Sequence, residues 1–158
     1  MEVCYSKHQI SQLVENFKTR KLPKADWTHH AHLTVAVWHI KNHDFFEAVC
    51  QLKSGIILLN DSHQTENTSK SGYHETITIF WASVIQMYAS LFRELPLEQL
   101  VNGFLNSNLS DKNLLFKFYD RTTLMTASLR TIYEAPILSE LNKSTISEIL
   151  AEKTKHST

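Results

Sequence analysis

Turn-forming residues are scarce in this chain, and their scarcity limits the folds that it can adopt. The 158 residues include only three glycines and three prolines, whereas these residues make up about 7% and 5% of average proteins. An all-β fold needs a turn signal at roughly every eighth to twelfth residue. The sequence therefore predicts an all-α fold. We expect a single-domain, up-and-down helical bundle of about six to eight helices.

The expected helices follow from apolar residues that recur at spacings of three and four. Cap residues precede three of these helices, at Ser6, Thr28 and Asp44. The predicted helices cover residues 6–20, 29–41, 45–59, 73–94, 96–105, a short segment after Ser110, 127–134, and a tail from about residue 144 that we expect to form a dispensable helix on the bundle surface. Residues 61–72 are polar and predict a loop, which in a compact domain is often functional.

Charge and composition exclude several classes of function. Lysine and arginine number 16, and aspartate and glutamate also number 16, so neither a nucleic acid nor a membrane is an expected partner. Cys4 and Cys50 give no disulfide framework and no zinc-finger spacing. The chain has no apolar signal segment and no glycine-rich nucleotide motif. We therefore expect a cytoplasmic protein that binds a small molecule and uses no nucleotide cofactor.

Four histidines stand at the expected starts of two helices, and His30, which points about 100° away from His29, is the one not assigned to the site. His29 and His32 open the second expected helix, and His74 lies at the start of the fourth. If helices two, three and four pack as antiparallel neighbours, the two starts share one end of the bundle. Apolar periodicity then directs the rings of His29 and His74 toward the axis. Imidazole nitrogens and a carboxylate such as Glu75 suit zinc, or iron(II) when coordination positions stay open.

The leading hypothesis is a mononuclear site for a divalent metal, zinc or iron, with His29, His32 and His74 as ligands. Glu75 or water would complete the site, and Glu75 would be a ligand or the general base if the protein is a metal-dependent enzyme acting on a small molecule. The partial positive charge at each helix start disfavours a bound cation by about 0.3–1 kcal/mol. This penalty cannot cancel the roughly 10 kcal/mol or more that a structural zinc site provides.

Two other functions stay open from the sequence alone. Neutral histidines at two helix starts could hold a small anionic ligand without a metal. Alternatively, the chain is a helical interaction domain in which the histidines have no catalytic role. Tyr73, Arg121 and Arg130 are candidate substrate-binding residues, because a phenol can donate a proton and an arginine can clamp an anion. Their alternative roles are a hydrophobic staple for Tyr73 and solvated surface charges for the arginines.

Several other residues are expected to be structural. Cys50 lies in the apolar register of its helix and is predicted to be a small core residue. Five histidines outside the cluster are predicted to lie at the surface, with His63 in the loop that could fold over the site; they are His8, His39, His43, His63 and His156.

Two strings of residues carry a resemblance to a known family. They are Trp27-Thr28-His29-His30-Ala31-His32-Leu33 and Gly72-Tyr73-His74-Glu75-Thr76-Ile77-Thr78. They resemble segments of small bacterial all-α proteins, generally described as uncharacterised, that pair an aromatic-Thr-His-x-x-His-Leu motif with a later Tyr-His-Glu-Thr motif. The resemblance covers about residues 26–82, with a weaker likeness from Phe118 to Ile137. It implies the same four site residues, His29, His32, His74 and Glu75, and it implies no substrate.

Overall fold

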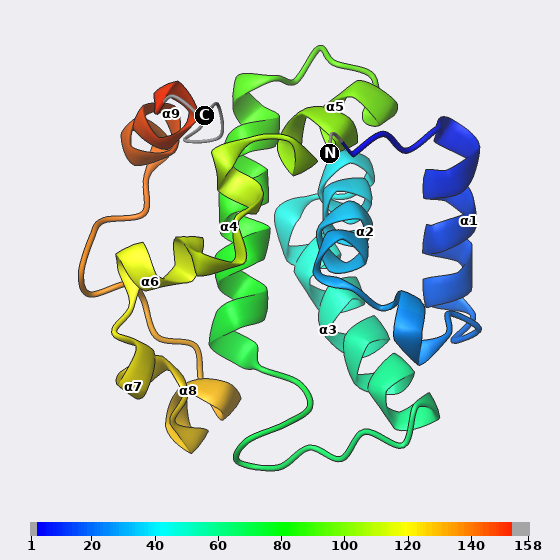
Figure 1. Ribbon diagram of the computed structural model, residues 1–158, viewed down its shortest axis with the longest axis vertical. Helices are drawn as coiled ribbons and strands as arrows, with labels where there is room; N and C mark the ends of the chain where they lie inside the picture. Colours follow the sequence, from blue (N-terminus) through cyan, green and yellow to red (C-terminus); the bar gives the residue numbers. More distant parts are fainter. Residues whose placement is uncertain (1–2, 153–158) are drawn as a thin grey trace, which may run out of the picture.

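The computed structural model describes residues 3–152, and every regular element in this range is a helix (Figure 1). The all-α prediction is therefore confirmed. The longer helices are α1 (Lys7–Lys18), α2 (His29–Asn42), α3 (Phe45–Ser62), α4 (Glu75–Leu91), α5 (Leu97–Leu105) and α9 (Lys143–Ala151). The shorter ones are α6 (Leu115–Phe118), α7 (Arg121–Leu124) and α8 (Ala127–Thr131), with 3-10 turns η1 (Lys24–Asp26), η2 (Asn108–Ser110) and η3 (Lys112–Leu114). Within residues 3–152, no helix is both long enough and apolar enough to cross a membrane.

The first helices begin where side chains satisfy their unpaired amide groups. Ser6 and Gln9 form a reciprocal capping box ahead of α1. The Thr28 hydroxyl accepts a hydrogen bond from one backbone amide of α2, and the Asp44 carboxylate accepts hydrogen bonds from two backbone amides of α3. The three caps predicted from the sequence are confirmed.

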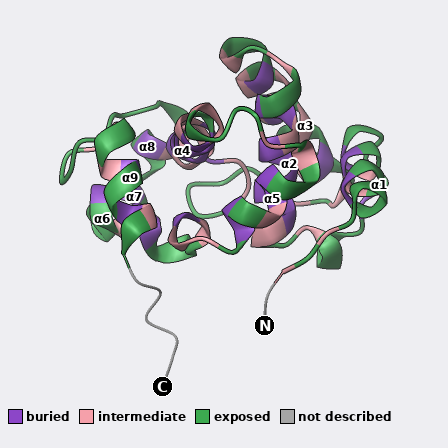
Figure 2. Ribbon diagram, turned by 90° about the horizontal axis from the view of Figure 1, so that it is seen from above, coloured by how far each residue is buried: buried purple, intermediate pink, exposed green. Residues whose placement is uncertain are grey.

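Helix α2 lies at the centre of the molecule and packs against α1, α3, α4 and α5. Its buried residues lie on all sides of the helix, as expected for a helix that its neighbours cover. In Figure 1, α3 runs opposite to α2 and α4, so α2 and α4 begin toward the same end of the molecule. Figure 2 shows buried residues gathered on the inward sides of the helices and exposed residues on the outward sides.

Two single residues lie where the sequence does not predict them. His39, predicted at the surface, is only 1% exposed, and its ring packs edge-on against Phe17 of α1. The prediction is wrong because α1 covers the face of α2 that carries His39. Cys50, predicted in the core, is exposed. Helix α3 turns only a narrow stripe inward, which includes Ala48 and Leu52.

The C-terminal segments pack against α4 (Figure 1). Helix α9 contacts α4 and η2, and it buries Ile146 and Ile149 in the common core. The side-chain amide of Asn108 donates to the carbonyls of Ile149 and Glu152. The predicted tail helix therefore forms and packs its apolar face on the core, and the expectation that its removal is tolerated stays a prediction.

The polar connection between α3 and α4 covers residues 63–74 instead of 61–72, because α3 continues to Ser62. The ring of His63, at the beginning of this connection, donates from Nε2 to the Leu22 carbonyl at 2.7 Å. Near its end, Gly72 adopts a φ of 85°, a conformation that favours glycine. We call residues 63–74 the polar loop.

Candidate functional site

A cavity of about 320 Å³ lies among residues of α2, α3 and α4. Its volume is at the lower end of the range for small-molecule sites. Apolar and aromatic side chains form most of its wall: Leu33, Ala36, Leu52, Ile56, Ile77 and Trp81. Trp27, His29, His32 and Thr78 complete the lining, so no Asp, Glu, Lys or Arg of residues 3–152 lines the cavity.

The two histidines of the cavity each use one ring nitrogen to bind the backbone. His29 Nε2 lies 2.9 Å from the Ser110 carbonyl oxygen, and His32 Nδ1 lies 2.7 Å from the Thr28 carbonyl oxygen. A carbonyl oxygen only accepts, so these two nitrogens carry the protons. In a neutral ring, the other nitrogen is then an acceptor, namely Nδ1 of His29 and Nε2 of His32.

Burial keeps both rings neutral. Loss of solvent lowers the pKa of His29 and lowers the pKa of His32 to about 4, and in both cases this effect outweighs the hydrogen bond to the backbone carbonyl. At neutral pH both residues are therefore hydrogen bond acceptors, and their unprotonated nitrogens are also in the form that binds metal ions.

Aromatic contacts fix the positions of these two rings. His32 stacks on Trp27 with ring centroids 3.6 Å apart, and Trp27 in turn stacks on Phe17 at 5.2 Å. His29 meets Trp81 edge-on at 5.3 Å. The indole Nε1–H of Trp27 is buried and has no hydrogen bond partner among residues 3–152. The cavity wall thus contains aromatic rings in mutual contact and one unsatisfied donor.

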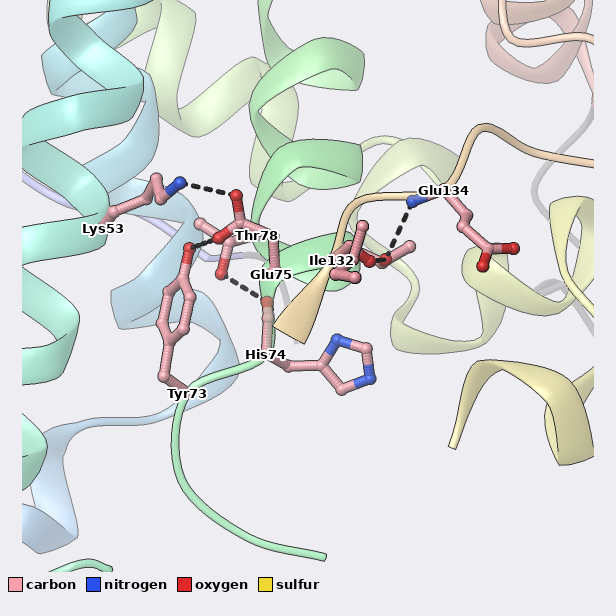
Figure 3. Close-up of polar contacts among 8 residues, drawn as sticks. Lys53, Tyr73, His74, Glu75, Thr78, Ile132 and Glu134 are labelled. Carbon is pink, nitrogen blue, oxygen red and sulfur yellow. Dashed lines mark hydrogen bonds and ion pairs between the residues drawn. The ribbon is translucent and has the colours of Figure 1, made fainter. Parts of the chain in front are cut away.

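His74 has a different position from the one predicted. It is the N-cap of α4: its Nδ1 accepts the Ile77 amide at 3.3 Å, and its Nε2–H donates to the Leu124 carbonyl at 3.0 Å. Figure 3 shows its ring on the opposite side of the chain from the Tyr73 ring. His74 does not line the cavity. Both of its nitrogens hold α4 to its own first turn and to α7.

Glu75 is held in a polar network beside the cavity (Figure 3). Lys53 Nζ lies 2.5 Å from one carboxylate oxygen of Glu75, and the Tyr73 hydroxyl donates to the other at 2.7 Å. The Glu75 side chain is 13% exposed. Burial, followed by the contact with Glu75, raises the pKa of Tyr73 far above its usual value, so the phenol stays protonated. The next turn of α4 places Thr78 in the cavity wall.

The four residues of the predicted metal site are therefore only partly brought together. His29 and His32 share the cavity, whereas His74 and Glu75 are engaged with other partners. Within the described part of the chain, no three His, Cys, Asp or Glu side chains are grouped so that they could hold a metal ion. The metal site stays a prediction.

The two predicted anion-binding arginines also lie outside this cavity. Arg121 is exposed, and its guanidinium lies 3.8 Å from the ring centre of Phe116. Arg130 donates from Nη1 to the carbonyls of Gly72 and Tyr73, and so joins α8 to the end of the polar loop.

Sequence reasoning does not find the tryptophans of the site. From the sequence, neither Trp27 nor Trp81 is assigned to the site, and Trp27 occurs only within a motif. A signal exists, because Trp81 lies one helical turn after Thr78 and two turns after His74, on the line of α4 that faces α2. Trp27 comes directly before the cap of α2, where its position is set by the turn η1 rather than by a periodic pattern.

No family model matches this chain, and no match was found among curated proteins or among solved structures.

Proposed function

We propose that this protein binds a small, uncharged and mostly apolar molecule that carries a hydrogen bond donor. The observation that supports the proposal is an apolar cavity of about 320 Å³ whose wall contains two neutral histidines with acceptor nitrogens. A ligand of this kind would place its apolar body against Trp81 and its neighbours and donate to His29 or His32.

The lining favours an uncharged ligand over an ionic one. Within the described range, no Asp, Glu, Lys or Arg lines the cavity, so a charged molecule would lose its hydration without gaining an ion pair. The acceptor nitrogens of His29 and His32 would face an anion with their lone pairs, which is repulsive. These features argue against an anionic ligand between the two helix starts.

Intrinsic fluorescence can test the proposal, because Trp27 and Trp81 line the cavity. A Trp38→Phe variant removes the third tryptophan, which is not among the lining residues. Benzyl alcohol is the probe, and toluene is the matched probe without a donor. We expect both to change the emission, with benzyl alcohol binding about two- to twelvefold more tightly, the effect of one hydrogen bond with a net value of about 0.5–1.5 kcal/mol.

Four variants make this test specific. Ala36→Met narrows the cavity and should weaken both probes, whereas Ala89→Met adds the same side chain to α4 outside the lining and should leave binding unchanged. His29→Phe or His32→Phe keeps a ring but removes an acceptor, so one of them should abolish the preference for benzyl alcohol. Unaltered emission with both probes, or equal binding by Ala36→Met and the parent protein, would contradict the proposal.

The same two histidines support a second candidate, a divalent metal ion bound by His29 and His32. Their unprotonated nitrogens are on residues three apart in one helix, a spacing that suits a shared ion. Glu75 would join as a ligand or general base only by leaving Lys53 and Tyr73, and His74 only by leaving Leu124. Metal analysis of protein purified without a histidine tag tests this: less than about a tenth of an equivalent excludes it.

A cytoplasmic location is part of the proposal. Cys4 and Cys50 both lie in the described part of the chain, where they are exposed, free thiols, and such thiols persist in reducing compartments.

A further inference from the structure

A second hollow, of about 430 Å³, lies between the polar loop and α8. Asn67, Thr68 and Ser69 line it from the loop, and Arg130 and Thr131 line it from α8. Among residues 3–152, it shares no lining residue with the cavity that contains His29 and His32. Ligand binding in this hollow is therefore independent of the proposed function.

Arg130 is the charged residue of this hollow, and its guanidinium is only partly satisfied. Nη1 donates to the carbonyls of Gly72 and Tyr73 at 3.2 and 3.1 Å. Among residues 3–152, Nε is buried without a partner, and no carboxylate forms an ion pair with this side chain. Burial lowers the pKa of Arg130, as expected for a cation that has lost water and gained no anion.

A neighbouring residue responds to this uncompensated charge. The pKa of His74 is lowered first by burial, and then also by the positive charge of Arg130. No Asp or Glu of the described residues lines the hollow. The charged side chain that lines the hollow is therefore a cation, and an anion bound there would meet this charge without a lining carboxylate beside it.

The remaining lining residues offer donors at the same place. The Oδ1 atom of Asn67 accepts a hydrogen bond from the Tyr73 amide at 2.8 Å. Its Nδ2 group therefore remains available as a donor to another partner. The Ser69 hydroxyl makes no hydrogen bond within the described range of the chain, and it also lines the hollow. A guanidinium, an amide and a hydroxyl together form a donor set that matches the several oxygens of a phosphate or a carboxylate.

We propose that the hollow between the polar loop and α8 binds a small oxyanion, a phosphate or carboxylate group, through Arg130 with Asn67 and Ser69. Arg130 then has two roles: Nη1 holds the loop end, and Nη2, which makes no hydrogen bond among residues 3–152, binds the anion. The rival explanation is that Arg130 only clamps the loop carbonyls, in which case no anion binds here.

Titration of the ¹⁵N-labelled protein with inorganic phosphate, and separately with acetate, tests the site at constant ionic strength set by chloride. We expect saturable shifts of the amide signals of residues 67–73 and 127–131 with at least one of the two anions, and the anion that binds more tightly identifies the preferred group. Arg130→Gln should weaken this binding at least about tenfold. Arg121→Gln removes the same charge from the neighbouring helix α7, outside the hollow, and should bind like the parent protein.

If Arg130→Gln does not fold, Ser69→Ala takes its place. Ser69 is exposed and makes no hydrogen bond in the described structure, so its loss should not affect folding but should weaken binding several-fold. The proposal is overturned if neither anion gives saturable shifts. It is also overturned if Arg121→Gln weakens binding as much as Arg130→Gln, since that would indicate general charge screening.

Discussion

At the scale of single residues, Tyr73 and His74 are neighbours in the sequence but belong to different parts of the molecule. The phenol of Tyr73 turns to Glu75 on one side of the chain (Figure 3). The ring of His74 lies on the other side, where it bonds to the Leu124 carbonyl. The periodic line of Thr78 and Trp81 predicts His74 in the cavity. That extrapolation fails because His74 is the N-cap, with φ −136° and ψ 109°, and a helical spacing does not apply to a residue in extended conformation.

His74 is thus expected to contribute to stability more than to ligand binding. His74→Ala removes the cap of α4 and the bond to Leu124, and should lower the free energy of unfolding by about 1–3 kcal/mol. His74→Asn keeps a good cap and loses only the bond to Leu124, so its loss should be smaller. Urea unfolding measures both. Equal stability of the alanine variant and the parent protein would rule out this structural role.

The low pKa of His32 makes a second prediction at this scale. Its folded-state pKa of about 4 lies below the ordinary value of 6.5, so the unfolded chain binds more protons between these values. The contribution of His32 to the free energy of unfolding is therefore fully present above about pH 6.5 and declines as the pH is lowered toward about 4. The slope is at most about 1.4 kcal/mol per pH unit, and it is smaller than this because the ring is partly exposed. Urea midpoints across this range should show a shallower decline for His32→Gln. An unchanged decline would contradict the prediction.

At the scale of elements, the contact between α1 and α3 depends on a glycine within a helix. A Cβ at Gly55 would overlap Cζ of Phe17, whose ring is buried between the helices. Glycine within a helix lowers its stability relative to alanine. The close approach to α1 explains why glycine occupies this position.

Gly55→Ala should therefore destabilise the protein despite its better helix propensity. The gain in propensity is about 1 kcal/mol, while the displaced Phe17 ring costs about 1–3 kcal/mol. We expect a lower melting temperature. Ser54→Ala, at the exposed neighbouring position, is the control and should change stability by less than about 0.5 kcal/mol. A more stable Gly55→Ala protein would show that α1 adjusts freely.

The short helices α7 and α8 are the least predictable elements. The sequence predicts one helix over 127–134, which agrees with the start of α8 and extends beyond its end, and it does not predict α7; the region has no clear periodicity. The local signals are present, because Asp120 caps α7 and Thr126 caps α8. The lengths of these two helices are set by tertiary contacts, since each buries only one leucine, Leu124 or Leu129. A four-residue element cannot show a helical period.

At the scale of the whole molecule, the fold class could be predicted from the lack of turn residues and from the caps of α1, α2 and α3. The order α2, α3, α4 also places two helix starts at one end, and the polar loop connects to that end (Figure 1). The direction in which each histidine ring points at these helix starts could not be predicted. That choice depends on the segments that follow α5, which provide Leu124 as a partner for His74.

The integration of α9 leads to a prediction about the complete fold. Ile146 is fully buried where α9 meets the core, so Ile146→Ala should lower the free energy of unfolding by about 2–5 kcal/mol. Ser147→Ala, on the exposed side of the same helix, is the matched control. Thermal unfolding of both variants measures the difference. A tail helix that only rests on the surface would give two proteins of nearly equal stability.

Long-range ¹H–¹⁵N NMR of the histidine side chains, recorded with and without benzyl alcohol, observes the proposed acceptor nitrogens themselves. At neutral pH, we expect His32 to be neutral with its proton on Nδ1, and His29 to be neutral with its proton on Nε2. The probe should shift the acceptor nitrogen of His29 or His32 and leave His74 unchanged. Binding in the cavity would be refuted if the signals of His74 moved together with those of His29 and His32, or if none of the three responded.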